Sequence, residues 1–215
     1  MNWADFNRRE AFLARAGQRL LAEPEPPRRS GEPVQGDHRL PGFDPEPERI
    51  ANAVDAAVLV GVTFRQEGGG IILTERSPHL RHHSGQVAFP GGRIDPGETP
   101  LEAALREAEE EVDLKRRFVR PIGYLPSYYT GTGYRIVPTV AVVDPDAPLT
   151  PNPDEVGRVF EAPLSTIFDM ARYRTETRMW EGRERRYYVV DHADAYIWGA
   201  TAALIRLLYE RLAEP

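Results

Sequence analysis

One helix with a complete start signal does most to limit how this chain can fold. Thr99 is followed by Pro100 and, three residues after the threonine, by Glu102. A threonine N-cap, a proline at the first helical position and a glutamate at the third form a capping box, which predicts a helix over residues 99–114. Its apolar residues recur at steps of three and four, so one face should be buried against other elements: Leu101, Ala104, Leu105, Ala108 and Val112.

Strand-like runs lie on both sides of this helix. Before it, residues 56–64 and 71–74 are apolar runs separated by a glycine-rich turn, which predicts a hairpin. After it, four more runs have the composition of strands, and residues 195–212 have helical spacing. A helix set among strands predicts a mixed α/β domain with a largely antiparallel or mixed sheet. The later runs are 118–125, 134–143, 158–163 and 186–190.

The first fifty residues differ in composition from the rest of the chain. Residues 3–21 combine many charges with a loosely helical apolar spacing, which predicts an amphipathic helix. Residues 23–47 contain seven prolines and three glycines, too many for regular structure, and predict a linker or a wrapping arm. We therefore expect an N-terminal helix and arm over residues 1–49 and the main folded domain over residues 50–215.

Composition excludes several classes of function. Without cysteine the chain has no disulfide, thiolate metal site or cysteine nucleophile, and this fits a cytoplasmic location. A net charge of −6 argues against a broad surface for nucleic acid, so any phosphate recognition should be local. The chain lacks an apolar run that could span a membrane. We expect a soluble protein in which a local basic cleft could still attract a small anionic substrate; the oligomeric state stays open, a homodimer included.

A cluster of glutamates gives the helix its chemical interest. Glu107, Glu110 and Glu111 stand at i, i+3 and i+4, so their carboxylates project from one side and repel one another. Hard divalent cations prefer oxygen ligands and bridge carboxylates to substrate phosphates, which would turn this repulsion into a metal site. One alternative is a solvated acidic face without a ligand, and another is a docking face for a basic partner.

The residues around the cluster distinguish these alternatives. Gly92, Glu98 and the run 106–114 resemble the Nudix box, G-x5-E-x7-R-E-U-x-E-E-x-G-U, in which U is an aliphatic residue. The match fails only at Asp113, where the family has glycine, and aspartate tolerates the left-handed conformation better than most residues. The resemblance implies an α/β/α sandwich around a mixed sheet and a hydrolase of diphosphates that uses Mg²⁺ or Mn²⁺.

The same resemblance assigns roles to individual residues. Glu107, Glu110 and Glu111 would bind the metal and carry catalysis, together with the backbone carbonyl of Gly91. Arg106 would act with them by pairing with Glu98 or Glu102 and so orienting the loop. Three glutamates remain open as the base that activates water: Glu110, Glu111 and Glu155.

The segment before the box indicates a substrate. Residues 72–92 resemble the signature of the coenzyme A pyrophosphatase branch of Nudix enzymes, L-L-T-x-R-[SA]-x3-R-x3-G-x3-F-P-G-G, and depart from it only at Ile72. This implies coenzyme A or a derivative, cut to adenosine 3′,5′-bisphosphate and 4′-phosphopantetheine. Two alternatives stay open. The chain could hydrolyse another nucleoside diphosphate derivative such as ADP-ribose, or it could be a non-catalytic Nudix-like binding module. The expected substrate contacts are Arg76, Ser77, Arg81, Gly85, Phe89 and Arg93.

Two further groups of residues leave their roles open. His79, His82 and His83 lie in a loop after a proline, where we expect solvent exposure or a phosphate contact rather than zinc, since no cysteine is available. Tyr128 and Tyr129 precede a Thr-Gly-Thr-Gly loop, so their rings could stack on adenine or pack at a sheet edge.

Overall fold

The computed structural model describes residues 6–28, 30, 35–42, 47–78, 85–180 and 182–214. Its helices are α1 (Arg9–Arg19), α2 (Pro47–Ala51), α3 (Pro100–Val112), α4 (Leu164–Ile167) and α5 (Gly199–Ala213). Its strands are β1 (Gln35–Gly36), β2 (Val54–Arg65), β3 (Gly68–Arg76), β4 (Val87–Ala88), β5 (Gly91–Arg93), β6 (Val119–Tyr124), β7 (Tyr128–Tyr129), β8 (Tyr134–Val143), β9 (Val156–Pro163), β10 (Tyr173–Trp180), β11 (Arg183–Val190) and β12 (Ile197–Trp198). Short 3₁₀ helices lie at Asp37–Arg39, Arg116–Phe118 and Met170–Arg172.

A mixed sheet of nine strands forms the centre of the fold. Its path is β1-β7-β8-β2-β3-β4, with β5 paired to β2, β6 to β8 and β9 to β3. Strands β2 and β8 are parallel, whereas β2 and β3 form the expected antiparallel hairpin. A second sheet, β10-β11-β12, stands apart from this path.

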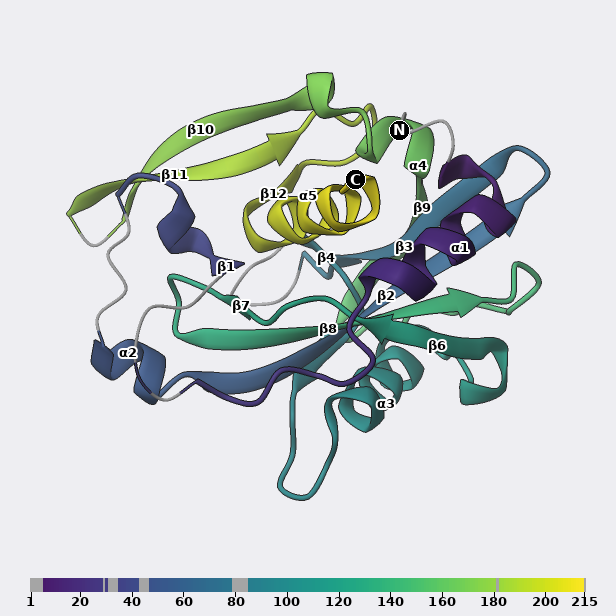
Figure 1. Ribbon diagram of the computed structural model, residues 1–215, viewed down its shortest axis with the longest axis horizontal. Helices are drawn as coiled ribbons and strands as arrows, with labels where there is room; N and C mark the ends of the chain where they lie inside the picture. The colour runs from purple at the N-terminus through teal and green to yellow at the C-terminus, as the bar shows by residue number, and fades with distance from the viewer. Residues whose placement is uncertain are drawn as a thin grey trace.

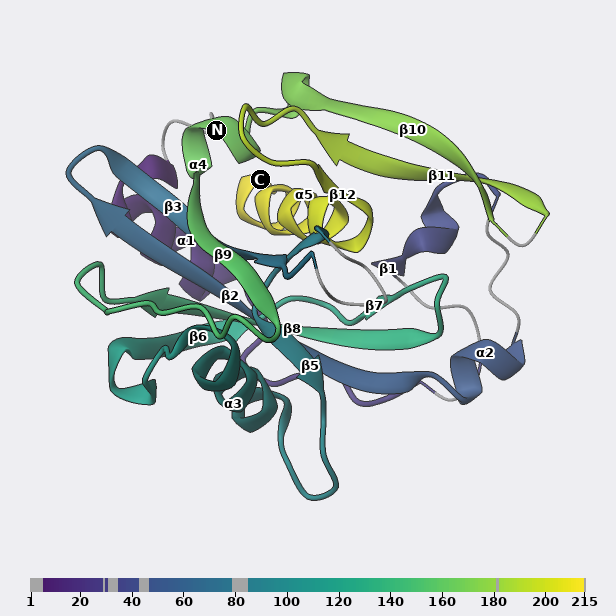
Figure 2. The same cartoon turned by 180° about the vertical axis from the view of Figure 1, so that it is seen from behind.

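Helices cover both faces of the large sheet. Figures 1 and 2 show α3 on one face and α5 with α1 on the other. Ala104, Ala108 and Val112 of α3 are buried in one apolar cluster with β2, and Leu204 and Leu208 of α5 are buried in the other. The predicted α/β/α sandwich around a mixed sheet is therefore confirmed.

The helix predicted over 99–114 is present as α3. The Thr99 hydroxyl accepts a hydrogen bond from the Glu102 backbone N–H at 3.2 Å, and the Glu102 carboxylate accepts one from the Thr99 backbone N–H at 2.8 Å. Asp113 ends the helix in the left-handed region at φ 57°. Both the capping box and the tolerated aspartate are confirmed, because each depends on local geometry alone.

One long strand was not predicted. Strand β10 pairs with β11 along its whole length, from Tyr173 opposite Val190 to Trp180 opposite Arg183. Most residues of β10 are exposed, so its sequence lacks the apolar alternation that marks a half-buried strand. Pairing with a neighbouring strand, rather than burial of an apolar face, accounts for this element.

The N-terminal segment lies against the body of the protein. Phe12 and Ala16 of α1 are buried in the same apolar cluster as α5. Further along, β1 pairs in parallel with β7, and the Glu25 carboxylate accepts a hydrogen bond from the Ser127 N–H at 2.9 Å. These contacts agree with a wrapping arm; the division of the chain at residues 49 and 50 stays a prediction. Among the described helices, none is long and apolar enough to cross a membrane.

Candidate active site

The parallel strands β2 and β8 begin at the same end of the sheet, and the glycine-rich loop before α3 lies at this end. Ala56 of β2 is paired with Arg93 of β5, and Val54 of β2 is paired with Tyr134 of β8. From β5 the chain turns and enters α3, which lies against β2 and β5 (Figure 2).

Arg106 joins the acidic groups of this region. Its guanidinium donates two hydrogen bonds to Glu98, at 2.8 and 3.0 Å, and further bonds to Glu107 at 2.9 Å and Glu110 at 3.2 Å. It also donates to the backbone carbonyl of Arg93 at 3.0 Å. Pairing with Arg106 lowers the pKa of Glu98 to about 2. Of the two expected partners, Glu98 is therefore the one bound, and Arg106 ties the loop to the helix.

Glu111 is the most buried carboxylate of the cluster. Only 5% of the residue is exposed, and its Oε2 atom has no hydrogen-bond partner. Burial, reinforced by the charges of Glu107 and Glu155, raises the pKa of Glu111 to about 8, although Arg76 and the backbone N–H of Gly91 act in the opposite direction. The sequence could not place Glu155; the structure brings it close enough to act on Glu111 and Glu107 electrostatically.

Two glycines let the backbone approach these carboxylates. A side chain at Gly92 would collide with the Glu107 carboxylate, and one at Gly91 would collide with the backbone of Ala57 and Val58. Glycine is therefore required at position 91, where β5 approaches the β2 backbone, whereas a side chain at position 92 would displace the flexible Glu107 carboxylate.

The donor set fits a hard divalent cation. Glu107, Glu110 and Glu111 supply oxygen atoms, and the unpartnered Oε2 of buried Glu111 needs a positive or hydrogen-bonding partner. No group of three His, Asp or Glu side chains in the described ranges is already arranged as a metal site. Arg106 holds Glu107 and Glu110 in ion pairs. Metal binding would require these carboxylates to turn.

The predicted substrate residues occupy different environments. Arg76 acts electrostatically on Glu111, and its buried Nε atom has no hydrogen-bond partner. The Ser77 N–H donates to the Glu155 carbonyl at 2.9 Å, and the Gly85 N–H donates to the Arg76 carbonyl at 3.1 Å. Arg93 is exposed and lies over the ring of Tyr134. Arg76 therefore lies beside the acidic cluster, whereas Ser77 and Gly85 are linked to its neighbours through the backbone and the Arg93 side chain faces Tyr134.

Three aromatic residues that the sequence offered as ligand contacts are buried in the structure. Phe89 is 3% exposed and lies in the main apolar cluster, so we leave it out of the substrate contacts. Tyr128 and Tyr129 are each 5% exposed, which favours packing over stacking on adenine. Arg81 and the three histidines at 79, 82 and 83 lie outside the described residues.

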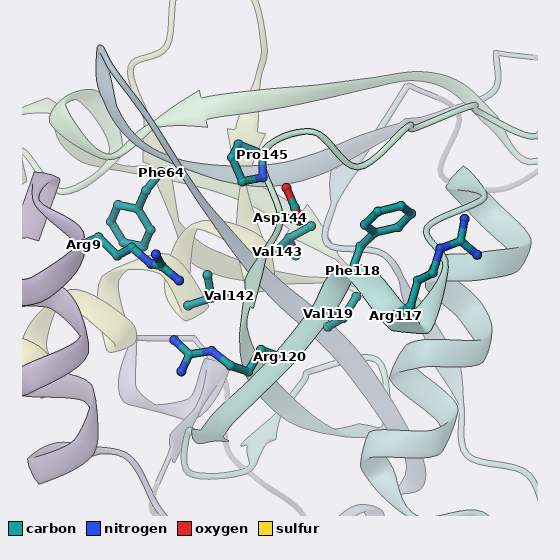
Figure 3. Close-up of a pocket in the computed structure, with 10 residues that line it drawn as sticks. All are labelled: Arg9, Phe64, Arg117, Phe118, Val119, Arg120, Val142, Val143, Asp144 and Pro145. Carbon is teal, nitrogen blue, oxygen red and sulfur yellow. The ribbon is translucent and has the colours of Figure 1, made fainter.

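A cavity of about 430 Å³ lies at the opposite end of the sheet (Figure 3). It is lined by Phe64 near the end of β2 and by Val143 at the end of β8, with the guanidinium groups of Arg9 and Arg120 beside it. Along β2, the stretch from Val58 to Phe64 spans about 20 Å. Of the described residues that line this cavity, Asp144 is the one carboxylate. The cavity therefore lacks the acidic groups of a catalytic metal site.

Glu111 should give the metal-free protein a characteristic dependence of stability on pH. Its pKa is 4.5 ordinarily and about 8 in the folded protein, so between these values the unfolded chain has released a proton that the folded chain retains. The free energy of unfolding should therefore fall as pH rises through this window and level off above it. Thermal unfolding in EDTA at pH 5 to 9 measures this, and Glu111→Gln should show a smaller fall. Identical pH profiles for the two proteins would contradict the assignment.

Known proteins provide an independent comparison. Residues 55–188 match the NUDIX domain family. The chain is 42% identical, over 158 residues, to proteins described as "Uncharacterized Nudix hydrolase NudL" from Escherichia coli and Escherichia fergusonii, with 73% of this chain and 82% of those proteins covered. Among solved structures, it resembles a Caenorhabditis elegans Ap4A hydrolase (TM-score 0.47, 19% identity, 54% of this chain and 85% of that chain) and a Deinococcus radiodurans protein (TM-score 0.48, 20% identity, 73% and 83%).

The capped helix, its glutamates and the family match agree, and the chain belongs to the Nudix hydrolase family. It is therefore a hydrolase that acts on diphosphate bonds. Enzymes of this family generally use divalent metal ions, which agrees with the oxygen-rich donor set described above.

Proposed function

We propose that this enzyme hydrolyses the diphosphate of coenzyme A or a derivative to adenosine 3′,5′-bisphosphate and 4′-phosphopantetheine or its acyl form. The observation that carries the proposal is the position of Arg76. It occupies a fixed arginine position of the coenzyme A pyrophosphatase signature, and its charge acts on Glu111 of the Nudix box. A guanidinium beside the acidic cluster, with one buried nitrogen lacking a partner, suits a phosphate of the substrate.

The metal of the proposal is Mg²⁺ or Mn²⁺, held by Glu107, Glu110 and Glu111 with the Gly91 carbonyl. When bound, such an ion neutralises phosphate charge and makes a water molecule more acidic. The buried position of Glu111 supports its assignment as a ligand, because a divalent cation would stabilise the charged form that burial disfavours.

Protein groups must also accept a proton from the attacking water. Glu110 and Glu111 of the box are candidates, and Glu155 joins them because its charge acts on both Glu107 and Glu111. Glu155 reaches the cluster from a separate segment, where its carbonyl accepts the Ser77 N–H. We assign Ser77 and Gly85 to shaping the backbone around Arg76, and Arg93 to a phosphate contact at the exposed edge of the site.

Substrate selectivity tests the proposal. The enzyme should hydrolyse coenzyme A with a kcat/KM about ten- to a hundredfold above that for dephospho-coenzyme A, the loss expected when one charge-assisted hydrogen bond to the 3′-phosphate is removed. ADP-ribose, which lacks both the 3′-phosphate and the pantetheine arm, should be poorer still. The three substrates are compared at one Mg²⁺ concentration and matched ionic strength, with products identified by mass, since salt weakens phosphate contacts.

A reaction in EDTA serves as the control and should show no turnover. If ADP-ribose proved to be the best of the three substrates, the diphosphatase chemistry would stand and the coenzyme A proposal would be wrong.

A further inference from the structure

A second cavity lies at the same end of the sheet as the glycine-rich loop. It has a volume of about 170 Å³ and lies under the β10–β11 hairpin, and we call it the hairpin pocket. Pockets that enclose a whole drug-sized ligand measure about 300–1,000 Å³, so this one suits an end group of a larger molecule. The lining residues used below are Gln86, Thr130, Arg178, Trp180, Tyr187 and Trp198.

One face of the small sheet forms most of the wall. Arg178 is opposite Arg185 across the β10–β11 pair, and Trp180 and Tyr187 lie two residues from them on the same face. Trp198 of β12 is paired with Val189 and belongs to this face as well. Alternation along three strands therefore directs aromatic and cationic side chains to the same side, where the pocket lies.

The pocket is basic although the chain carries a net charge of −6. Three arginines line it, at 178, 185 and 186, against one carboxylate, that of Asp37. Asp37 is already engaged, because its two oxygens accept hydrogen bonds from the Tyr128 hydroxyl and the Gly131 N–H, each at 2.6 Å. Arg178 is exposed, and none of the described residues forms a hydrogen bond or ion pair with its side chain. A localised positive charge of this kind attracts phosphate.

The aromatic side chains add a surface for a flat ring. Tyr187 and Trp198 lie edge to face with their centroids 5.1 Å apart, and Trp180 is 39% exposed. Nucleobases stack on such side chains. The Thr132 hydroxyl lies at the polar side of the pocket, where it pairs with the Thr130 hydroxyl at 2.9 Å; the latter also accepts the Tyr134 N–H. Aromatic rings beside arginines thus fit a nucleotide better than a purely aliphatic or purely anionic ligand.

The pocket adjoins the candidate active site on two sides. On one side, the Gln86 carbonyl accepts a hydrogen bond from the Arg76 N–H at 3.0 Å. On the other, the Thr130 N–H donates to the Tyr134 carbonyl at 2.9 Å, and Arg93 lies over the ring of Tyr134. A ligand in the pocket therefore lies next to the segments that carry two of the proposed phosphate contacts.

We propose that the hairpin pocket binds the adenine base and the 3′-phosphate of the substrate, an assignment that rests on the proposed function. Arg178 contacts the 3′-phosphate, while Trp180 and Trp198 stack against the base. The diphosphate then extends past Gln86 toward Arg76 and the acidic cluster. In this arrangement the β10–β11 hairpin determines which nucleotide is accepted, and the Nudix box performs the hydrolysis.

Tryptophan fluorescence tests the pocket without any turnover. The full chain in EDTA is titrated with adenosine 3′,5′-bisphosphate, with AMP and with 4′-phosphopantetheine. We expect the bisphosphate to quench the emission and bind more tightly than AMP. In Arg178→Ala, its Kd should rise about ten- to a hundredfold, the effect of one lost charge-assisted hydrogen bond. Trp180→Phe should reduce the quenching.

The matched control is Arg174→Ala. Arg174 lies on the same strand but outside the pocket, where it pairs with Glu176 at 2.6 Å, so its replacement should leave the Kd unchanged.

A second readout uses kinetics: Arg178→Ala should lower kcat/KM for coenzyme A toward the value for dephospho-coenzyme A. Equal Kd values for wild type and Arg178→Ala, with coenzyme A still hydrolysed, would overturn the pocket and leave the proposed function standing. Failure of wild type to hydrolyse coenzyme A would instead overturn the proposed function.

Discussion

Replacing Glu107 or Glu111 by glutamine should lower turnover by about a hundredfold or more, the scale on which catalytic electrostatic contacts act. Glutamine keeps the size of the side chain and removes the charge that a divalent cation needs. Both residues lie on one side of α3, and Glu111 is buried with an unpartnered oxygen. The measurement is kcat at saturating Mg²⁺, with circular dichroism to confirm that each variant is folded.

Glu109→Gln is the matched control for this experiment. Glu109 belongs to the same helix, but its side chain is 47% exposed and its carboxylate pairs with Lys115 at 2.9 Å, away from the cluster. Its replacement should leave kcat within about twofold of wild type, as for most surface substitutions. Near-normal turnover in both Glu107→Gln and Glu111→Gln would remove these residues from the metal site.

Loss of Arg106 should reduce both stability and activity. In Arg106→Ala, three carboxylates lose their shared cation, and Glu98 loses a two-pronged contact that orders the loop before α3. Removing hydrogen bonds to charged groups of this kind costs about 1.5–3 kcal/mol of unfolding free energy. We expect kcat to fall about tenfold to a hundredfold because the loop and the glutamates lose their alignment.

Arg106→Lys separates the geometry of this contact from its charge. Lysine keeps the positive charge but lacks the planar fork that binds Glu98 through two nitrogens, so it should recover stability more fully than kcat. Urea unfolding and steady-state kinetics measure the two effects, with Lys115→Ala, which removes an exposed cation beside Glu109, as the control. A kcat equal to wild type in both Arg106 variants would show that the contact does not position the site.

Local sequence patterns were enough to predict the helix that carries the chemistry. The capping box at Thr99, the left-handed Asp113 and the spacing of Glu107, Glu110 and Glu111 depend on residues within a few turns of one another. The hairpin of β2 and β3 and the long strand β8 followed from apolar runs for the same reason. The pattern of the box also led to the family, which the comparisons confirm.

Features that depend on contacts between distant segments of the chain could not be predicted from the sequence as well. No pattern marked β10, because its residues are mostly exposed and its partner strand supplies the pairing. From the sequence, Tyr128 and Tyr129 could either stack on adenine or pack at a sheet edge. Their burial in the folded chain favours packing. Phe89 matched a signature position, yet its side chain is part of the core.

By itself, the sequence determined the capped helix, the carboxylates it presents and the family to which the enzyme belongs, since these depend on short-range spacing and on residue type. Only the tertiary structure decided that Glu155 and Arg76 act on the same buried carboxylate, Glu111, and that the arginines and tryptophans of a hairpin gather beside the catalytic loop. The physical reason is that electrostatic interaction and desolvation depend on distance through space, and strand pairing brings together residues that lie far apart along the chain.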